Sequence, residues 1–301
     1  MEGRDSKLFK KVSPILKKKN FFPWKIFLWE ALLFSLTLGL GIIVAFRLNR
    51  FQGIQETSLP SISLGEVIFY FVLGTFFVGG LISFKKFKKK GRILLKAFFV
   101  LSVFFGGLIS ITFLLPEFWM SDIFALVLIG ILIFIWLKKP SVFLHDLLIV
   151  FSISGIAGAL GVNFDPWMVV TLLVIFSIYD FIAVYKTKHM VKMARELTKM
   201  GIISALIIPQ QFSDFKRPLK EVRPGGKFLI LGGGDIAFPL FLCASLVSQG
   251  IWGSLIVAFF ALIGLFVSFL IFVTQKKRKP IPALPPIAFC SIIGFLITLI
   301  I

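Results

Sequence analysis

The sequence is poor in the residues that build metal centres, disulfide frameworks and nucleophilic dyads. Its two cysteines, Cys243 and Cys290, lie in apolar runs and form no C-x-x-C pair, so we expect neither a disulfide framework nor a metal site. Its two histidines, His145 and His189, form no H-E-x-x-H motif, which argues against a zinc enzyme. The chain also lacks a G-x-S-G motif, which argues against a Ser–His hydrolase. No metal and no cofactor are expected.

Charged residues are also scarce, at 16% of the chain, whereas soluble domains carry about 25%. Hydrophobic residues make up 58% of the sequence, including 38 Phe, and the mean hydropathy is +0.98. A surface this apolar requires lipid, so we expect an integral membrane protein with the bilayer as a partner. The net charge of +19 lies mainly between the apolar runs. Basic loops orient membrane helices, so this charge does not indicate nucleic acid as a partner.

Nine apolar runs are long enough to cross a bilayer, which requires roughly 20 residues each. They predict an all-α polytopic membrane protein. The predicted helices are 24–46, 64–84, 93–115, 118–137, 141–161, 167–185, 228–248, 251–273 and 281–301.

The loops between these helices alternate in basic charge. Four of them carry 6, 2, 10 and 4 Lys or Arg residues, whereas the loops on the other side carry 2 or none. This alternation predicts a cytoplasmic N-terminus and an outer C-terminus, because basic loops stay in the cytoplasm. We expect a basic cytoplasmic segment at 1–23 and one nine-helix domain at 24–301 in the cell membrane. Within it, the cytoplasmic loop 186–227 begins with an amphipathic surface helix over 186–208.

Eight ionisable side chains fall within the predicted helices, where burial in hydrocarbon is unfavourable. Near helix ends, such residues are commonly interface anchors. We assign that role to Glu30, Glu66, Lys96 and Asp122. Glu30 and Lys96 both lie near inner helix ends and could pair with each other. The roles of His145 and Asp146 stay open. The full set is Glu30, Glu66, Lys96, Asp122, His145, Asp146, Asp180 and Asp235.

Asp180 and Asp235 differ from the others because they lie at one depth on consecutive antiparallel helices. Asp180 precedes the cytoplasmic end of the sixth helix by about five residues, and Asp235 follows the start of the seventh by about seven. Both are therefore roughly 8–11 Å inside the boundary. Two facing carboxyl groups about 3 Å apart share one proton and can act as general acid and base on a peptide bond. An ion-coupled transporter or cation channel using the same carboxylates is the alternative.

Glycine and proline interrupt the helices near these acids. Three glycines, residues 232–234, directly precede Asp235, and they favour a close backbone approach or a departure from helical geometry. Four prolines in 280–286 open the ninth helix. They leave backbone groups unpaired, so we expect this segment to be covered by protein or to face a wet cavity.

Together these segments resemble the presenilin and signal-peptide-peptidase family of intramembrane aspartyl proteases. Its Y-D motif matches Tyr179-Asp180, its G-x-G-D motif matches residues 232–235, and its P-A-L motif matches residues 282–284. The motif order and the nine-helix topology also agree. The stretch YKTKHM, residues 185–190, is similar to the archaeal presenilin homologues.

The resemblance implies an aspartic endopeptidase of the GxGD type that cleaves transmembrane peptides or proteins and needs no cofactor. It makes Asp180 and Asp235 the catalytic pair. The implied site-shaping residues are Tyr179, Gly232, Gly233 and Gly234. The implied substrate-binding residues are Pro282, Ala283 and Leu284. The loop 186–227 is short for a presenilin, so no obligatory partner subunit is expected, and the oligomeric state is left open.

Overall fold

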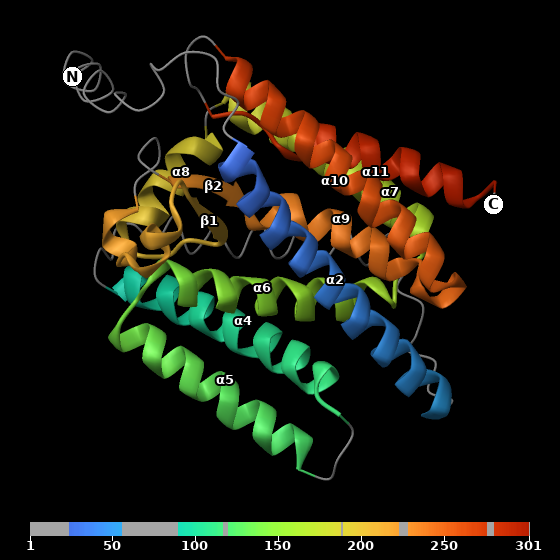
Figure 1. Ribbon diagram of the computed structural model, residues 1–301, viewed down its shortest axis with the longest axis horizontal. Helices are drawn as coiled ribbons and strands as arrows, with labels where there is room; N and C mark the ends of the chain where they lie inside the picture. Colours follow the sequence, from blue (N-terminus) through green and yellow to red (C-terminus); the bar gives the residue numbers. More distant parts are fainter. Residues whose placement is uncertain are drawn as a thin grey trace.

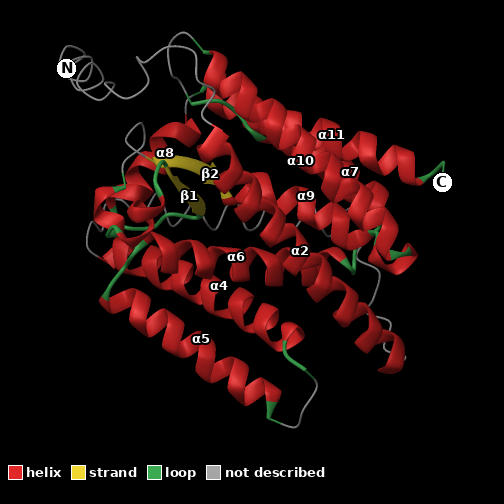
Figure 2. Cartoon of the chain, in the orientation of Figure 1, coloured by secondary structure: helices red, strands yellow, loops and turns green. Residues whose placement is uncertain are grey.

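In the computed structural model, long helices lie side by side, and a small two-stranded sheet sits at one end of them (Figures 1 and 2). Helices α4, α5 and α6 form one side of the molecule, α7, α10 and α11 form the other, and α2 and α9 lie between them. The predicted segment 1–23 and the predicted second helix, 64–84, lie outside the described residues. The structure describes residues 24–55, 90–116, 120–187, 189–222, 228–275 and 280–300.

Within the described residues, six helices are long and apolar enough to cross a membrane. Helix α7 reaches that length together with the π-helical turn η2 (Ile182–Lys186) that continues it. Two shorter apolar helices are α9 (Gly233–Ser245), which ends in the 3₁₀ turn η5 (Val247–Gln249), and α11 (Leu284–Thr298). The six long helices are α2 (Trp24–Gln55), α4 (Lys90–Leu114), α5 (Ser121–Lys138), α6 (Val142–Gly161), α7 (Pro166–Phe181) and α10 (Ile251–Thr274).

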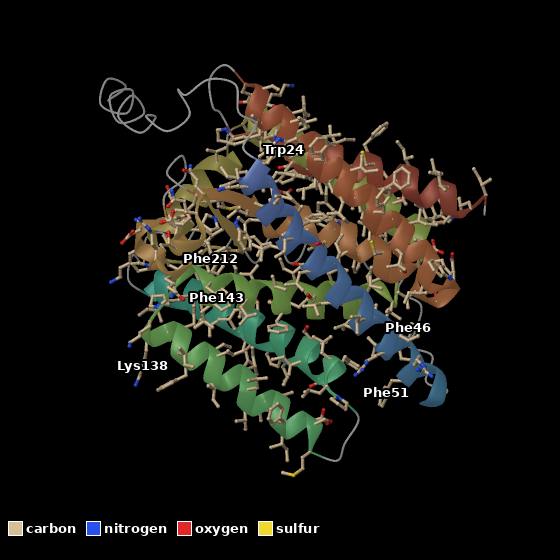
Figure 3. The ribbon with its side chains drawn as sticks, in the orientation of Figure 1. Trp24, Phe46, Phe51, Lys138, Phe143 and Phe212 are labelled. Carbon is tan, nitrogen blue, oxygen red and sulfur yellow. The ribbon has the colours of Figure 1, made fainter. Side chains whose placement is uncertain are left out.

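Large apolar side chains cover the outside of the long helices. Figure 3 shows Phe46 and Phe51 at one end of the molecule and Phe143 near the sheet end, and all three are exposed. Such continuous apolar surface is typical of lipid-facing helices, and all of the backbone hydrogen bonds of a helix are internal, as lipid requires. The chain is a multi-pass integral membrane protein.

The sheet corrects two predictions of helix. Strand β2 (Phe228–Gly232) pairs antiparallel with β1 (Ala205–Pro209), with Ala205 opposite Gly232. The predicted seventh helix therefore begins as a strand, and α9 starts only at Gly233. The predicted surface helix over 186–208 is also too long, because α8 (His189–Lys199) is followed by Gly201, whose φ of +76° favours glycine, and then by β1. A short apolar run fits a strand as well as a helix, so hydrophobicity alone did not separate them.

Helix α6 is the central helix on which the sheet end is built. Its small residues allow close contact with neighbouring backbones, since a Cβ on Gly158 would lie 2.6 Å from the Gly41 carbonyl oxygen on α2. The start of α6 is held by the loop segment, because the Val142 N–H donates to the Arg217 carbonyl at 3.0 Å. The 3₁₀ turns η3 (Phe212–Lys216) and η4 (Leu219–Glu221) flank that contact.

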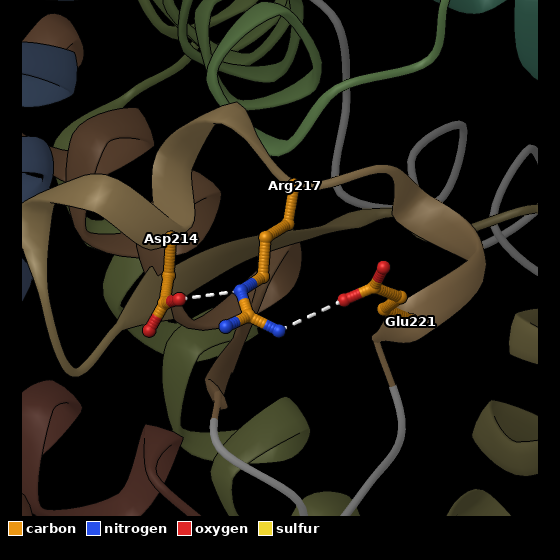
Figure 4. A network of polar contacts seen from close by, with 3 residues as sticks. All are labelled: Asp214, Arg217 and Glu221. Carbon is orange, nitrogen blue, oxygen red and sulfur yellow. Dashed lines mark hydrogen bonds and ion pairs between the residues drawn. The ribbon is translucent and has the colours of Figure 1, made fainter.

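Arg217 ties these two turns together (Figure 4). Its guanidinium donates to Glu221 Oε2 at 3.0 Å and to Asp214 Oδ1. Hydrogen bonds to Glu221 and to Asp214 raise the pKa of Arg217 above its ordinary value, so the group stays charged. The network orders the segment that anchors the first turn of α6.

Candidate active site

Helices α7 and α9 face each other through a stacked pair of aromatic rings. The Phe176 and Phe238 ring centroids lie 4.3 Å apart at an interplanar angle of 26°. Asp180 follows Phe176 by four residues, and Asp235 precedes Phe238 by three. Residues three or four apart share a helix face, so the stack turns both aspartates toward the contact between the two helices.

Asp180 lies in the last turn of α7 and is only 5% exposed. Its carboxyl group interacts with the backbone N–H of Leu284, the first residue of α11. The first N–H groups of a helix have no partner within the helix and are available to a nearby carboxyl group. Its Oδ2 atom is buried and has no hydrogen-bond partner in the described part of the chain.

Asp235 lies in the first turn of α9, directly after β2, and not within an unbroken helix as its predicted depth assumed. It is the third residue of the helix, and its carboxyl group lies beside Gly232, the N-cap residue, and interacts with the Gly232 backbone N–H. This position is the one from which a side chain in a capping box reaches back to the N-cap N–H. The contact holds the carboxyl group at the end of the strand.

The two carboxyl groups interact electrostatically. Each also sits at a helix N-terminus, Asp180 against α11 and Asp235 on α9, where the helix dipole favours negative charge. A pair with one buried oxygen free can hold a single proton and orient a water molecule. The arrangement is suited to general acid–base chemistry.

The glycines before Asp235 occupy two kinds of environment. The Gly233 N–H donates to the Ser204 carbonyl at 3.0 Å, and a Cβ on Gly233 would lie 2.9 Å from that same oxygen. Gly233 therefore permits the close approach of α9 to the chain that leads into β1. Gly234 is exposed, and a Cβ there would meet only the Phe238 ring, at 3.6 Å.

The P-A-L segment joins α7 and α9 through its last residue. Leu284 is buried and packs with Leu172 and Phe176 of α7, and two phenylalanines of α9 pack against the same cluster. Pro282 is buried, and Ala283 is partly buried. One apolar cluster therefore connects the helices that carry the two aspartates with the N-terminus of α11.

A cleft of about 140 Å³ opens beside Asp235, and we call this candidate active site the active-site cleft. Its walls come from α2, β2, the first turn of α9, the last two turns of α10 and the segment before α11. The lining residues are Glu30, Leu229, Ile230, Leu231, Asp235, Ser268, Phe269, Phe272, Pro280, Ile281 and Ala283. The proline segment thus faces a cavity, which is one of the two environments expected for it from the sequence.

Glu30 is the residue that the sequence analysis assigned wrongly. It was expected to be an interface anchor or to pair with Lys96, but it is buried in the active-site cleft and interacts electrostatically with Asp235. Lys96 is exposed and lines a separate hollow beside α4 and α5. The usable signal was depth, because Glu30 lies six residues into its helix, or about 9 Å, as deep as the aspartate pair.

His145 and Asp146 hold the outer edge of the sheet. His145 Nε2 lies 3.2 Å from the Ala205 carbonyl oxygen, and Asp146 Oδ1 accepts the Ile207 N–H at 2.9 Å. Both side chains are buried, at 1% and 2% exposure. Alternate residues of β1 pair with β2, so α6 binds the edge that β2 leaves free.

Two further predictions concern the surroundings of the pair. Tyr179 is 58% exposed on α7 and does not line the cleft, so its role in shaping the site stays a prediction. In the described residues, no three His, Cys, Asp or Glu side chains lie together as a metal site would require. The donors around Asp180 and Asp235 are backbone N–H groups.

The fold and site define a class: a polytopic helical membrane protein with two interacting aspartates, of which Asp180 is buried and Asp235 lines a cleft. Residues 31–301 match a family model described as signal-peptide peptidase, presenilin aspartyl protease. The chain belongs to this family and is an intramembrane aspartyl protease. The transporter or channel alternative has no support in these comparisons.

Two solved structures share the fold. One is described as a presenilin family intramembrane aspartate protease in space group C222, with 22% identity over 91% of this chain and 97% of that chain and a TM-score of 0.60. The other, in space group P2, has 23% identity over 89% and 96% of the two chains and a TM-score of 0.59. A search of curated proteins finds no match.

Proposed function

We propose that Asp180 and Asp235 are the catalytic pair with which this protein hydrolyses peptide bonds of transmembrane substrates. The observation that carries the proposal is the meeting of α7 and α9 at the Phe176–Phe238 stack, which turns both carboxyl groups toward one space. Each carboxyl group interacts with a backbone N–H, from Leu284 and from Gly232. The site is therefore preorganised, as efficient acid–base catalysis requires.

The proposed reaction needs one proton on the pair. The carboxylate takes a proton from water as the oxygen attacks the carbonyl carbon, and the protonated partner donates its proton to the carbonyl oxygen. In the resulting diol step, the aspartate that took the proton from water gives it to the amide nitrogen, the other aspartate takes a proton from a diol hydroxyl, and the C–N bond breaks to release the acid and the amine. The charge state belongs to the pair, so neither aspartate is assigned as the fixed acid.

The substrate is proposed to bind as an extended strand against β2. Because Gly233 bonds to Ser204, every second residue back along β2 also bonds to β1. Ile230 is one of the residues in between, so its N–H and C=O point to the free edge of β2. Leu229, Ile230 and Leu231 all line the active-site cleft, with Ala283 on another wall. Edge addition supplies backbone hydrogen bonds to a peptide of almost any sequence. Because Ala283 lines the same cleft as β2, this binding mode is consistent with the predicted substrate-binding role of Pro282, Ala283 and Leu284.

We propose the remaining topology from the loop charges. Nine membrane helices, with a cytoplasmic N-terminus and an outer C-terminus, place the sheet and both aspartates near the cytoplasmic face of the cell membrane. Lys138 lies at the sheet end, where that orientation expects basic residues (Figure 3). Arg217, which contacts the start of α6, is a second basic residue there. Residues 24–301 would form one protease domain that needs no partner subunit.

The test is cleavage of a transmembrane peptide by the purified protein in detergent or in liposomes. Asp180→Asn and Asp235→Asn are expected to abolish cleavage and to leave the fold intact, because each keeps the size of the side chain. Asp122→Asn is the matched control, since Asp122 is exposed in the first turn of α5. Near-normal cleavage by either catalytic variant would refute the assignment.

A further inference from the structure

The first turns of α2 aim Glu30 into the active-site cleft. Phe27 packs against Phe266 and Phe269 of α10, with ring centroids 5.1 and 5.2 Å apart. Trp24, labelled in Figure 3, stacks on Phe266 at 6.3 Å. Glu30 follows Phe27 by three residues and so lies on the same face of α2. This aromatic contact fixes the end of the helix that carries Glu30.

The Glu30 carboxyl group is buried without a complete set of partners. The side chain is 5% exposed, and Oε2 has no hydrogen-bond partner among the described residues. An unpaired buried carboxyl oxygen destabilises a protein, because it has lost its water and gained no replacement. A group of this kind in a cleft beside a reactive pair is better explained by a ligand than by packing.

The charges around the cleft indicate which ligand it is. Glu30 and Asp235 both line the cleft and interact electrostatically, and Asp235 also interacts with Asp180, so negative charge is concentrated on one side of the cleft. Among the described residues that line the cleft, none is Lys or Arg. A cation from outside would be attracted strongly there, since the surrounding apolar walls screen charge poorly.

We propose that Glu30 forms a subsite for a Lys or Arg side chain of the substrate. The inference rests on the proposed function. Transmembrane segments carry Lys and Arg at their cytoplasmic border, and the proposed topology places the cleft near that border. A strand added along β2 turns alternate side chains to one face, so a single substrate position would direct its basic side chain to Glu30.

The experiment is a peptide scan with the full-length protein. Lys is compared with Met, an uncharged side chain of similar length, at each of several positions on both sides of the cleaved bond. The wild-type protein is expected to prefer Lys at one position by about 10-fold or more in kcat/KM, as expected for a hydrogen bond between charged groups. Glu30→Gln is expected to reduce that Lys/Met ratio to near 1.

Asp122→Asn is the matched control, since it removes an exposed carboxylate outside the cleft and should preserve the wild-type ratio. Equal Lys/Met ratios in the wild type and in Glu30→Gln overturn the proposal. A wild-type protein without a Lys preference at any position also overturns it, even where the variant does not fold. Failure of the proposed function is distinct: wild-type protein that cleaves no peptide, or Asp235→Asn that still cleaves.

Discussion

Replacing Asp146 by alanine should loosen the strand that supports the active site. Asp146 Oδ1 accepts the Ile207 N–H at 2.9 Å inside the protein, where water cannot replace it. Leaving a buried N–H without an acceptor costs about 1–3 kcal/mol. In a domain of 150–250 residues each kcal/mol lowers the Tm by about 2–4 °C, and a chain of this size should shift by somewhat less.

Asp146→Asn is the control that isolates this hydrogen bond. The amide oxygen of Asn keeps the acceptor for Ile207, and the amide nitrogen replaces Oδ2, which has no partner among the described residues. We therefore expect its Tm to remain within a few degrees of wild type. Because β1 holds β2 and β2 leads directly into Asp235, Asp146→Ala should also lower kcat, and Asp146→Asn should largely restore it.

The assays are thermal unfolding in detergent micelles and peptide cleavage, with mass spectrometry of the products. A shift in the cleaved bond for Asp146→Ala would show that the sheet positions the substrate, because loss of stability alone does not move a cleavage site. The reasoning is refuted if Asp146→Asn loses as much stability and activity as Asp146→Ala. It is also refuted if Asp146→Ala matches the wild type in both assays.

Three other predictions test the site. Gly233→Ala should lower the Tm, because its Cβ would lie 2.9 Å from a backbone oxygen, whereas Gly234→Ala should leave the Tm unchanged or raise it slightly, since its nearest contact is a ring at 3.6 Å. Gly264→Ala should reduce kcat by displacing the start of α11, because its Cβ would lie 2.6 Å from the Ile287 Cα. Gly130→Ala is the control and should leave kcat unchanged, because a Cβ there meets nothing within 4 Å; cleavage rates compare the two variants. The pH profile of cleavage should be bell-shaped, because one proton on the aspartate pair is the active form, and a flat rate from about pH 4 to pH 9 would contradict the mechanism.

The sequence predicted most of the membrane helices because lipid imposes a simple rule of length and polarity on them. The helices α2, α4, α5, α6, α7 and α10 begin and end close to their predicted bounds, except that α2 continues to Gln55. The sheet was not predicted. Residues 228–232 are as apolar as a membrane helix, and only their pairing with 205–209, far along the chain, makes them a strand.

The candidate site shows the same division between local and distant information. Asp180 and Asp235 were found because short motifs surround them. Glu30 was missed because no motif accompanies it. The residues that share the cleft with it, such as Leu229 of β2 and Ser268 of α10, are more than 190 residues away in the sequence. The support that Asp146 gives to β1 depends likewise on a distant partner.

The contact between the Gly232 N–H and the Asp235 carboxyl group has a consequence for where a substrate is cut. It occupies the last outward N–H of β2, so Ile230 is the final residue of that edge with both backbone groups available. A peptide docked on this edge would run out of backbone partners where the aspartates begin. The position of the cleaved peptide bond would then be set by its distance from the last hydrogen bond between the substrate and β2. Substrates with unrelated sequences would be cleaved at the same number of residues from that hydrogen bond.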